Sequence, residues 1–152
     1  MGMYAALGIS ATGLSAQRFR MDVVANNLAN ADSTTGPGQA YRRQQVVMAP
    51  APGGPRFSLP AAGGIAAGGS IDASSDLKGV QVLAKVDDPT AMRRVYEPGH
   101  PHADANGYVT KPNVNTVIEM VDLVAATRSY QANVTTFDAT TQMAIDTLKV
   151  LR

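Results

Sequence analysis

The placement of proline limits how this chain can fold more than any other feature. All nine prolines lie between Asp32 and Asn113, so residues 1–31 and 114–152 contain none, and the second of these segments also lacks glycine. A proline inside a helix costs about 3 kcal/mol. Both ends of the chain are therefore free to form long helices, and the middle is not.

The spacing of apolar residues agrees, because alternate steps of three and four residues follow one face of a helix. In the C-terminal segment, eight of the ten positions on this seam are apolar or aromatic: Met120, Leu123, Thr127, Tyr130, Val134, Phe137, Thr141, Ala144, Leu148 and Leu151. In the N-terminal segment, seven of the nine positions reached by the same steps are apolar: Met3, Leu7, Ser10, Leu14, Gln17, Met21, Val24, Leu28 and Ala31. At about 1.5 Å per residue, the two helices would extend roughly 58 and 43 Å.

These patterns predict a mainly α protein in which the two terminal helices form an antiparallel coiled-coil hairpin. The expected division is an N-terminal helix over 1–31, a Gly/Pro-rich middle over 32–113 and a C-terminal helix over 114–152. Gly8 and Gly13 weaken the start of the first helix, which leaves Ser10 and Thr12 as alternative N-caps.

The middle is expected to hold a small β element of two to four strands. Residues 79–86 predict a strand, with 41–48 and 93–96 as its candidate partners, and Asn106-Gly107 predicts a tight turn. Residues 50–69 are rich in Gly, Pro and Ala and predict a flexible loop.

Composition excludes several functions. The net charge is +1 and aromatic residues make up 5%, so a nucleic-acid surface is not expected. The absence of Cys removes disulfides, thiolate zinc sites and Cys nucleophiles. No apolar run is long enough to span a membrane, and the N-terminus lacks the positive start of a secretory signal. We find no nucleophile elbow, Walker-type loop or dinucleotide fingerprint, and expect no enzyme activity, cofactor or small-molecule substrate.

Two groups of polar residues resemble sites without completing one. His100 and His102, with Asp104, half-match a metal or calcium loop, but a hydrogen-bonded polar turn is the favoured interpretation. Glu119 and Asp122 lie on one helical face and are interpreted as solvated or helix-N-terminal charges. The basic pairs at 42–43 and 93–94 are interpreted as surface charges or inter-subunit partners.

Amide side chains are concentrated where helices are expected. They are Asn26, Asn27 and Asn30 near the end of the first helix, and Gln131 and Asn133 within the second. Asparagine is a poor helix former, so this pattern indicates either specific hydrogen bonds at helix contacts or, for the first group, a frayed helix end.

A face of the C-terminal helix would also stay uncovered in a simple hairpin, because Val117, Val121 and Val124 form a second apolar stripe. The chain is either a two-helix hairpin capped by a β element or, as we favour, a hairpin completed by packing against neighbouring copies.

The two terminal segments resemble the flagellar axial proteins of bacteria, the family of rod, hook and hook-associated subunits. Residues 10–17 (SATGLSAQ) and 25–31 (ANNLANA) carry the N-terminal resemblance. Residues 100–109 (HPHADANGYV), 112–115 (PNVN), 119–122 (EMVD) and 128–133 (RSYQAN) are similar to the C-terminal part of proximal rod members.

This resemblance implies a structural subunit of the proximal rod that packs with related subunits into a torque-transmitting helical tube in the periplasm. It also implies export by the flagellar type III apparatus without a cleaved signal. The implied partners are copies of itself, proximal and distal rod subunits, the export-gate adaptor and the MS-ring. Alternatives are a distal rod or hook-type subunit, or a soluble coiled-coil adaptor.

The residues expected at assembly interfaces combine the seam and the amide positions. They are Leu7, Leu14, Met21, Val24, Asn26, Asn27, Leu28, Asn30, Met120, Leu123, Tyr130, Gln131, Asn133, Val134, Phe137, Leu148 and Leu151.

Overall fold

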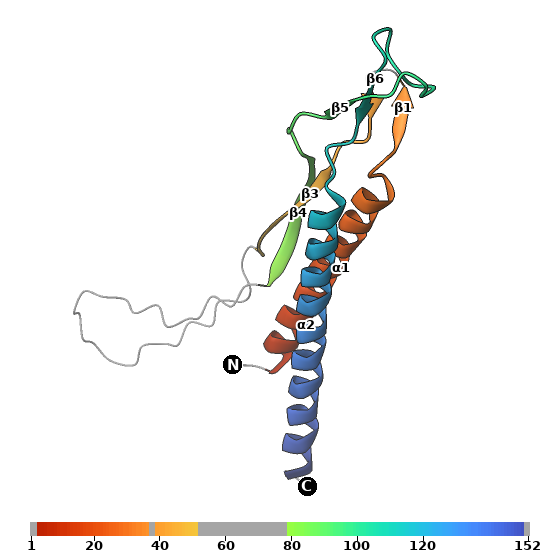
Figure 1. The fold of residues 1–152 in the computed structure, drawn as a ribbon. Coiled ribbons are helices and arrows are strands. Elements are labelled where there is room, and N and C mark those ends of the chain that lie inside the picture. Colours follow the sequence, from red (N-terminus) through yellow and green to blue (C-terminus); the bar gives the residue numbers. More distant parts are fainter. Residues whose placement is uncertain (1–2, 37–38, 52–78, 151–152) are drawn as a thin grey trace, which may run out of the picture.

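The computed structural model describes residues 3–36, 39–51 and 79–150. The structure contains two long helices, α1 (Met3–Ala29) and α2 (Thr116–Val150). Six short strands lie between them in the sequence. The strands are β1 (Thr34–Gly36), β2 (Gln39–Ala40), β3 (Gln44–Pro50), β4 (Val80–Asp87), β5 (Arg93–Tyr96) and β6 (Tyr108–Lys111). The predicted terminal helices and small β middle are thus confirmed, and the molecule is elongated (Figure 1). No helix within the described residues is both long and apolar enough to cross a membrane.

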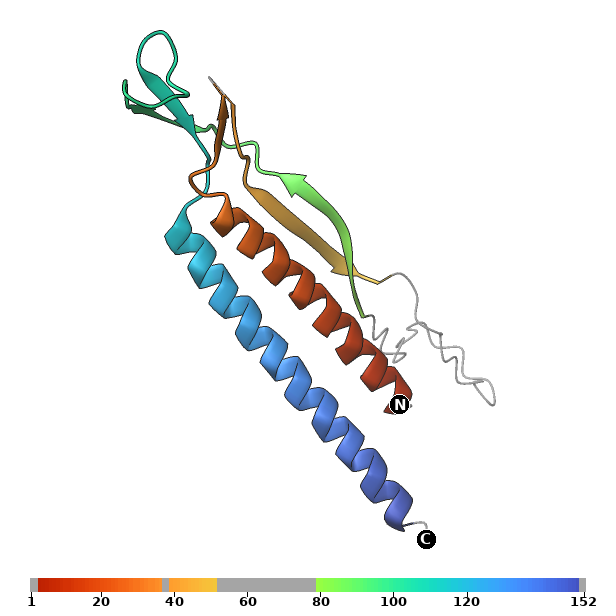
Figure 2. The same ribbon diagram turned by 90° about the vertical axis from the view of Figure 1, so that its right-hand side faces the viewer.

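The two helices lie side by side and run in opposite directions, with the start of α1 and the end of α2 toward the same end of the molecule (Figure 2). The contacts between the two helices follow this antiparallel order. Near the start of α1, Gly13 lies against the Asn133 side chain, and further along the Thr127 hydroxyl is 3.6 Å from the Met21 sulfur. At the end of α1, Asn27 reaches Glu119 in the first turn of α2.

Most seam positions point into this helix contact. In the N-terminal segment, every seam residue from Leu7 to Ala31 is buried or half-buried. On α2 the half-buried seam residues run from Leu123 to Ala144, whereas Met120 and Leu148 are exposed, and Leu151 lies outside the described residues. The most buried α2 positions are instead Glu119, Ala126 and Thr140. The α2 face in contact with α1 is therefore rotated by about one residue from the predicted seam, since adjacent residues differ by about 100°.

The start of α1 differs from the prediction. The helix begins at Met3 and continues through Gly8 and Gly13, so neither Ser10 nor Thr12 is its N-cap. A Cβ at Gly13 would lie 2.9 Å from Asn133 Nδ2, so this glycine allows the helices to approach closely. Thr12 has a different role, because its hydroxyl donates to the Ile9 carbonyl and accepts from Val80 N at 3.1 Å. Contact with α2 and β4 outweighs the helix-propensity cost of these residues.

Strands β3 and β4 form an antiparallel ribbon that lies along α1, on the side away from α2 (Figure 2). The predicted strand at 79–86 and its partner at 41–48 are confirmed by this pair. The register shifts between Val47 and Met48, which pair with Ala84 and Val82, so that Leu83 is the extra residue of a bulge. Residues 52–69 of the predicted loop lie outside the described residues.

The other strands form two further pairs beyond the end of the helix pair (Figure 1). The segment 93–96 forms β5 but pairs with β6, so its expected partnership with 79–86 is wrong. The predicted turn at Asn106-Gly107 is confirmed, with Gly107 at φ +78° and its N–H donating to the Asp104 carbonyl. The six described strands exceed the predicted two to four because β1 and β2 are too short to leave a sequence pattern.

Candidate functional site

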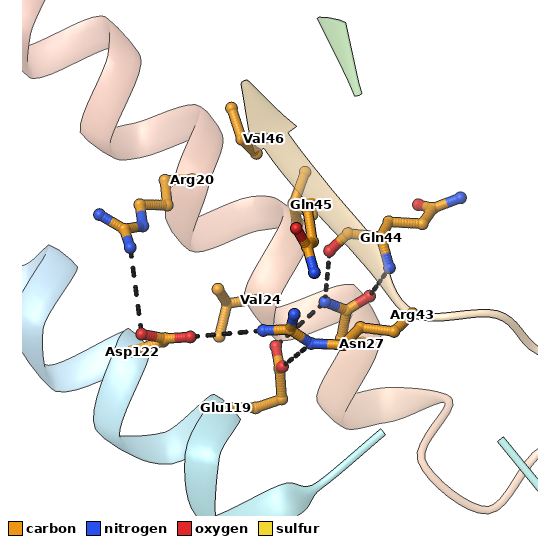
Figure 3. Close-up of a pocket in the computed structure, with 10 residues that line it drawn as sticks. Arg20, Val24, Asn27, Arg43, Gln44, Gln45, Val46, Glu119 and Asp122 are labelled. Carbon is orange, nitrogen blue, oxygen red and sulfur yellow. Dashed lines mark hydrogen bonds and ion pairs between the residues drawn. The ribbon is translucent and has the colours of Figure 1, made fainter. Parts of the chain in front are cut away.

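Where α1 ends and α2 begins, four segments that are distant in the sequence contribute to a group of polar side chains, most of which are drawn in Figure 3. Asn27 comes from the last turns of α1, Arg43 immediately precedes β3, and Glu119 lies in the first turn of α2. Asp88 follows β4, and Asp122 lies three residues beyond Glu119. We refer to Asn27, Arg43, Asp88, Glu119 and Asp122 as the polar cluster.

Local capping places Glu119 at this junction. Asn115 is the N-cap of α2, because its side-chain oxygen accepts from Val117 N at 3.0 Å and from Ile118 N at 3.4 Å. The Asn115 carbonyl accepts from Glu119 N, so Glu119 lies one turn into the helix. The positive end of the helix dipole favours a carboxylate there.

Asn27 is 1% exposed and uses its whole hydrogen-bonding capacity. Its Nδ2 donates to the Gln44 carbonyl at 2.8 Å and to Glu119 Oε2 at 3.0 Å. Its Oδ1 accepts from Gln44 N at 2.9 Å and from the Tyr41 hydroxyl at 2.8 Å. One side chain of α1 therefore holds both the strand and the second helix.

Glu119 is fully buried, with 0% exposure. Arg43 Nε donates to its Oε1 at 2.6 Å, and Asn27 donates to its Oε2. A buried carboxylate is costly unless it is paired and hydrogen-bonded. Because both of its oxygens have partners, Glu119 fixes the positions of Arg43 and Asn27 instead of leaving an uncompensated charge.

Arg43 connects the cluster to the β ribbon and to the next turn of α2. Its Nη1 lies 3.4 Å from Asp88 Oδ2 and its Nη2 lies 3.5 Å from Asp122 Oδ2, while Arg20 of α1 lies 4.0 Å from Asp122. Burial alone would lower the pKa of the Arg43 guanidinium, but the hydrogen bonds and charges of Glu119 and Asp88 raise it above its usual value. Arg43 therefore stays a cation.

The hydrogen bonds around Asp88 lower its pKa from 3.8 to about 2. The main causes are the hydroxyl and the backbone N–H of Thr90, both donating to Oδ1, followed by Arg43 and Gln45 on Oδ2. Tyr41, which donates to Asn27, has a raised pKa because it is partly buried and because Asp87 and Glu119 are nearby. At neutral pH both groups are held in one protonation state.

All residues of the cluster except Asp88 line a small cavity of about 160 Å³ between α1, β3 and α2 (Figure 3). Its carboxylates accept hydrogen bonds from protein groups, and the two hydroxyls among its immediate partners are both donors, that of Tyr41 to Asn27 and that of Thr90 to Asp88. This arrangement offers no free general base or activated nucleophile. Its role is structural, because its hydrogen bonds and ion pairs fix the two helices and the β3–β4 ribbon together.

Several sequence interpretations need correction here. Glu119 is a helix-N-terminal charge, as one of the two interpretations predicts, but it is fully buried and not solvated. Arg43 is half-buried and pairs within its own chain. Arg42, Arg93 and Arg94 are exposed surface charges, as predicted, and Arg94 pairs with Asp104 at 2.6 Å. Sequence reasoning also missed Gln44, whose contribution comes from its backbone and leaves no side-chain signal.

The amide residues separate into two groups. Asn27 makes a hydrogen bond between the helices, as one of the two interpretations predicts, and Asn133 lies at their contact beside Gly13. Asn30 instead closes the end of α1, donating to the Asn26 carbonyl and side chain and accepting from Ser33. Gln131 and Asn26 are exposed. The role of all these residues in assembly stays a prediction.

The two histidines form part of a hydrogen-bonded turn. His102 N donates to His100 Nδ1 at 3.1 Å, and Thr34 Oγ1 lies 2.9 Å from His102 Nδ1, which ties this turn to β1. Within the described residues, no three His, Cys, Asp or Glu side chains are grouped closely enough to hold a metal ion.

Comparisons with protein-family models match both ends of the chain. The family described as "Flagella basal body rod protein" matches residues 7–37, and the one described as "Flagellar basal body rod FlgEFG protein C-terminal" matches residues 105–149. The first match includes the Asn27 end of α1, and the second includes Glu119 and nearly all of α2.

Curated relatives extend this similarity over the whole chain. The flagellar basal-body rod protein FlgC of Salmonella typhimurium is 45% identical and covers 92% of this chain and 91% of its own length. FlgC of Bacillus subtilis is 41% identical, with 99% of both chains covered. FlgC of Borreliella burgdorferi is 36% identical, covering 100% of this chain and 99% of its own.

Proposed function

Because the chain belongs to the FlgC family of flagellar basal-body rod proteins, and is thus a structural subunit of the rod and not an enzyme, we propose that it occupies the proximal rod. There its helix pair packs with those of related subunits into a helical tube. The observation that carries this proposal is the match of FlgC relatives to nearly the full chain, middle region included. Distal rod and hook-type subunits resemble it in the terminal segments but typically carry larger inserted domains.

The helix pair has the properties that a tube of this kind requires. The polar cluster fixes α1, α2 and the β3–β4 ribbon as one unit, while the outer face of α2 leaves Val117, Val121 and Val124 more than half exposed. An exposed apolar face of this kind marks an interaction surface. The antiparallel helices pack as a coiled-coil hairpin, and neighbouring subunits complete the burial of their outer faces.

Such a tube transmits torque because closely packed helices resist twisting. Interdigitated side chains fill space at the density of organic crystals and leave little room to slip. Repetition of the same contact between subunits spreads the load. The assembly residues are the seam positions and the amides, including Met120 and Leu148, which are exposed in the single chain.

The location that this function implies is the basal body where it crosses the periplasm. The subunit reaches it through the flagellar type III apparatus without a cleaved signal. Its partners are copies of itself, proximal and distal rod subunits, the export-gate adaptor and the MS-ring. No nucleic acid or small-molecule substrate is required.

The proposal is tested by quantitative mass spectrometry of basal bodies purified from the source cells with detergent. A few copies of this chain per basal body support a proximal rod subunit. Tens of copies contradict the proximal position and favour a distal rod or hook-type subunit. A chain that is absent from basal bodies and remains soluble as a dimer or tetramer contradicts the proposal in favour of a coiled-coil adaptor.

A further inference from the structure

The outer face of α2 carries an open apolar groove near the start of the helix. It measures about 360 Å³ and is lined by Val117, Met120, Val121, Val124, Ala125 and Arg128. These residues recur at three- and four-residue intervals, so they form one helical face. The four large apolar side chains are each more than half exposed. The shape is that of a surface that receives another helix.

The charge at the edge of this groove identifies a complementary surface. Arg128 is exposed and makes no ion pair within the described part of the chain. Asp22 on α1 is also exposed and equally unpaired among those residues. It lies on the α1 face that is turned away from both α2 and the ribbon. The other exposed residues along that face are Gly8, Ala11, Ser15, Arg18, Ala25 and Ala29.

Resting on the proposed function, we propose that the α2 groove of one copy receives the outer face of α1 from a second copy of this chain. The contact is antiparallel, with Asp22 of one copy paired to Arg128 of the other. Copies that point the same way along a tube bring α1 and α2 together in this orientation, as α1 and α2 of a single chain already are (Figure 2).

The register set by this ion pair matches large residues with small ones. Moving from Asp22 toward the end of α1 places Ala25 opposite Ala125 and Ala29 opposite Val121. Small residues on α1 leave space for the valines and allow the helix axes to come close. Because both faces repeat with alternating three- and four-residue spacing, the match continues over several turns.

The polar residues on these faces can be buried without loss of hydrogen bonds. In the same register Ser15 lies opposite Thr135. Each hydroxyl already donates to its own helix, Ser15 to the Thr12 carbonyl at 2.8 Å and Thr135 to the Gln131 carbonyl at 2.9 Å. Covering them with a second helix leaves no unsatisfied donor.

The two faces are separate, so each copy can use both at once. The groove lies on the α2 face opposite α1, and Asp22 lies on an α1 face that contacts neither α2 nor the ribbon. Contacts between two different surfaces are heterologous, and repeating them generates a ring or an open helix. Side-by-side copies would therefore form one layer of a tube wall.

Disulfide cross-linking tests this contact, since the chain has no native cysteine. Cells would express two differently tagged copies, one Ala25→Cys and the other Ala125→Cys, and their basal bodies would be oxidised and separated without reductant. The matched control replaces Ala125→Cys by Ala139→Cys, which is exposed on the same face but about 21 Å further along the helix. A disulfide needs Cβ atoms about 4 Å apart.

A product joining the two tags for the 25–125 pair, and not for the 25–139 pair, is expected. Basal bodies that contain both copies but no 25–125 product overturn the proposed contact and leave the rod assignment intact, since another subunit would then occupy the groove. Absence of the chain from basal bodies overturns the proposed function and this contact together.

Exchange of the charges gives an independent test. Asp22→Arg or Arg128→Asp alone places like charges together, and each should lower the amount of the chain in basal bodies by about tenfold. The double variant Asp22→Arg/Arg128→Asp should restore it. Urea unfolding of each purified variant checks that the chain still folds, as expected for exposed positions. A double variant no better than the single ones overturns the ion pair.

Discussion

Asn27 bonds to both the N–H and the carbonyl of Gln44, so a helix side chain takes the place that a neighbouring strand would occupy. The first residue of β3 is thereby paired with α1 on one side and with Asp87 of β4 on the other. The same amide group also donates to Glu119. The angle and position of the ribbon relative to both helices therefore depend on one residue.

Replacing Asn27→Ala should lower the free energy of unfolding by about 3 kcal/mol, because it leaves buried groups of Gln44, Tyr41 and Glu119 without partners. The matched control is Asn26→Ala, which removes the same side chain from an exposed neighbouring position and should cost about 0.5 kcal/mol or less. Urea unfolding followed by circular dichroism measures both. Equal losses for the two variants would show that Asn27 is not a structural centre.

Two glycines of α1 should respond differently to replacement by alanine. Nothing lies within 4 Å of a Cβ at Gly8, so Gly8→Ala should stabilise the protein by about 1 kcal/mol through helix propensity. At Gly13 the new methyl group would press on the Asn133 amide and cancel this gain. Adding Asn133→Ala to Gly13→Ala removes the obstacle and should recover it. A thermal unfolding series of the wild type and these three variants would test this, and an equal gain at both glycines would contradict the close approach.

The lowered pKa of Asp88 predicts that the protein loses stability in acid. Because its pKa in the folded protein is lowered from 3.8 to about 2, its carboxylate stabilises the fold fully above about pH 4. That contribution disappears as the pH falls toward 2. The urea midpoint of the wild type should therefore fall more steeply between pH 4 and pH 2 than that of Asp88→Asn.

A second variant separates the causes of this shift. Thr90→Val removes the hydroxyl that donates to Asp88, so the pKa of the carboxyl should rise and the loss should begin at a higher pH. Identical acid profiles for the wild type and both variants would show that Asp88 does not contribute to the pH dependence.

Charges introduced into the helix contact should prevent assembly. Leu28 and Phe137 are half-buried on the facing sides of α1 and α2, and an aspartate at either position places an unpaired charge against apolar side chains. We expect Leu28→Asp or Phe137→Asp to abolish incorporation into basal bodies and swimming in soft agar. A strain that accumulates either variant at the wild-type level and still swims would contradict this.

The sequence predicts the helices well because their signals are local. Freedom from proline and the three- and four-residue spacing are properties of neighbouring residues, and α1 and α2 both end within two residues of the predicted limits. The start of α1 was less predictable. Its two glycines argue against a helix when they are considered alone, but at Gly13 the contact with Asn133 makes glycine the residue that fits.

The polar cluster was not predictable in the same way. Arg43 and Glu119 are separated by 76 positions, and no sequence spacing shows that their side chains lie 2.6 Å apart. Strand pairing met the same difficulty, since the four residues of β5 have no pattern that distinguishes β4 from β6 as a partner. Contacts between distant segments depend on the whole fold, whereas helices and turns depend on a few adjacent residues.

The ends of the β3–β4 ribbon have a consequence for how chains of this kind can change in length. Ala51 N donates to the Gly79 carbonyl at 2.7 Å, so the two residues that flank positions 52–78 are held together by their own hydrogen bond. Doubling the number of residues between two fixed ends costs only about 0.6 kcal/mol. Insertions or deletions between Ala51 and Gly79 should therefore leave the pairing of β3 with β4 unchanged. One scaffold can in this way accept segments of different length at the same position.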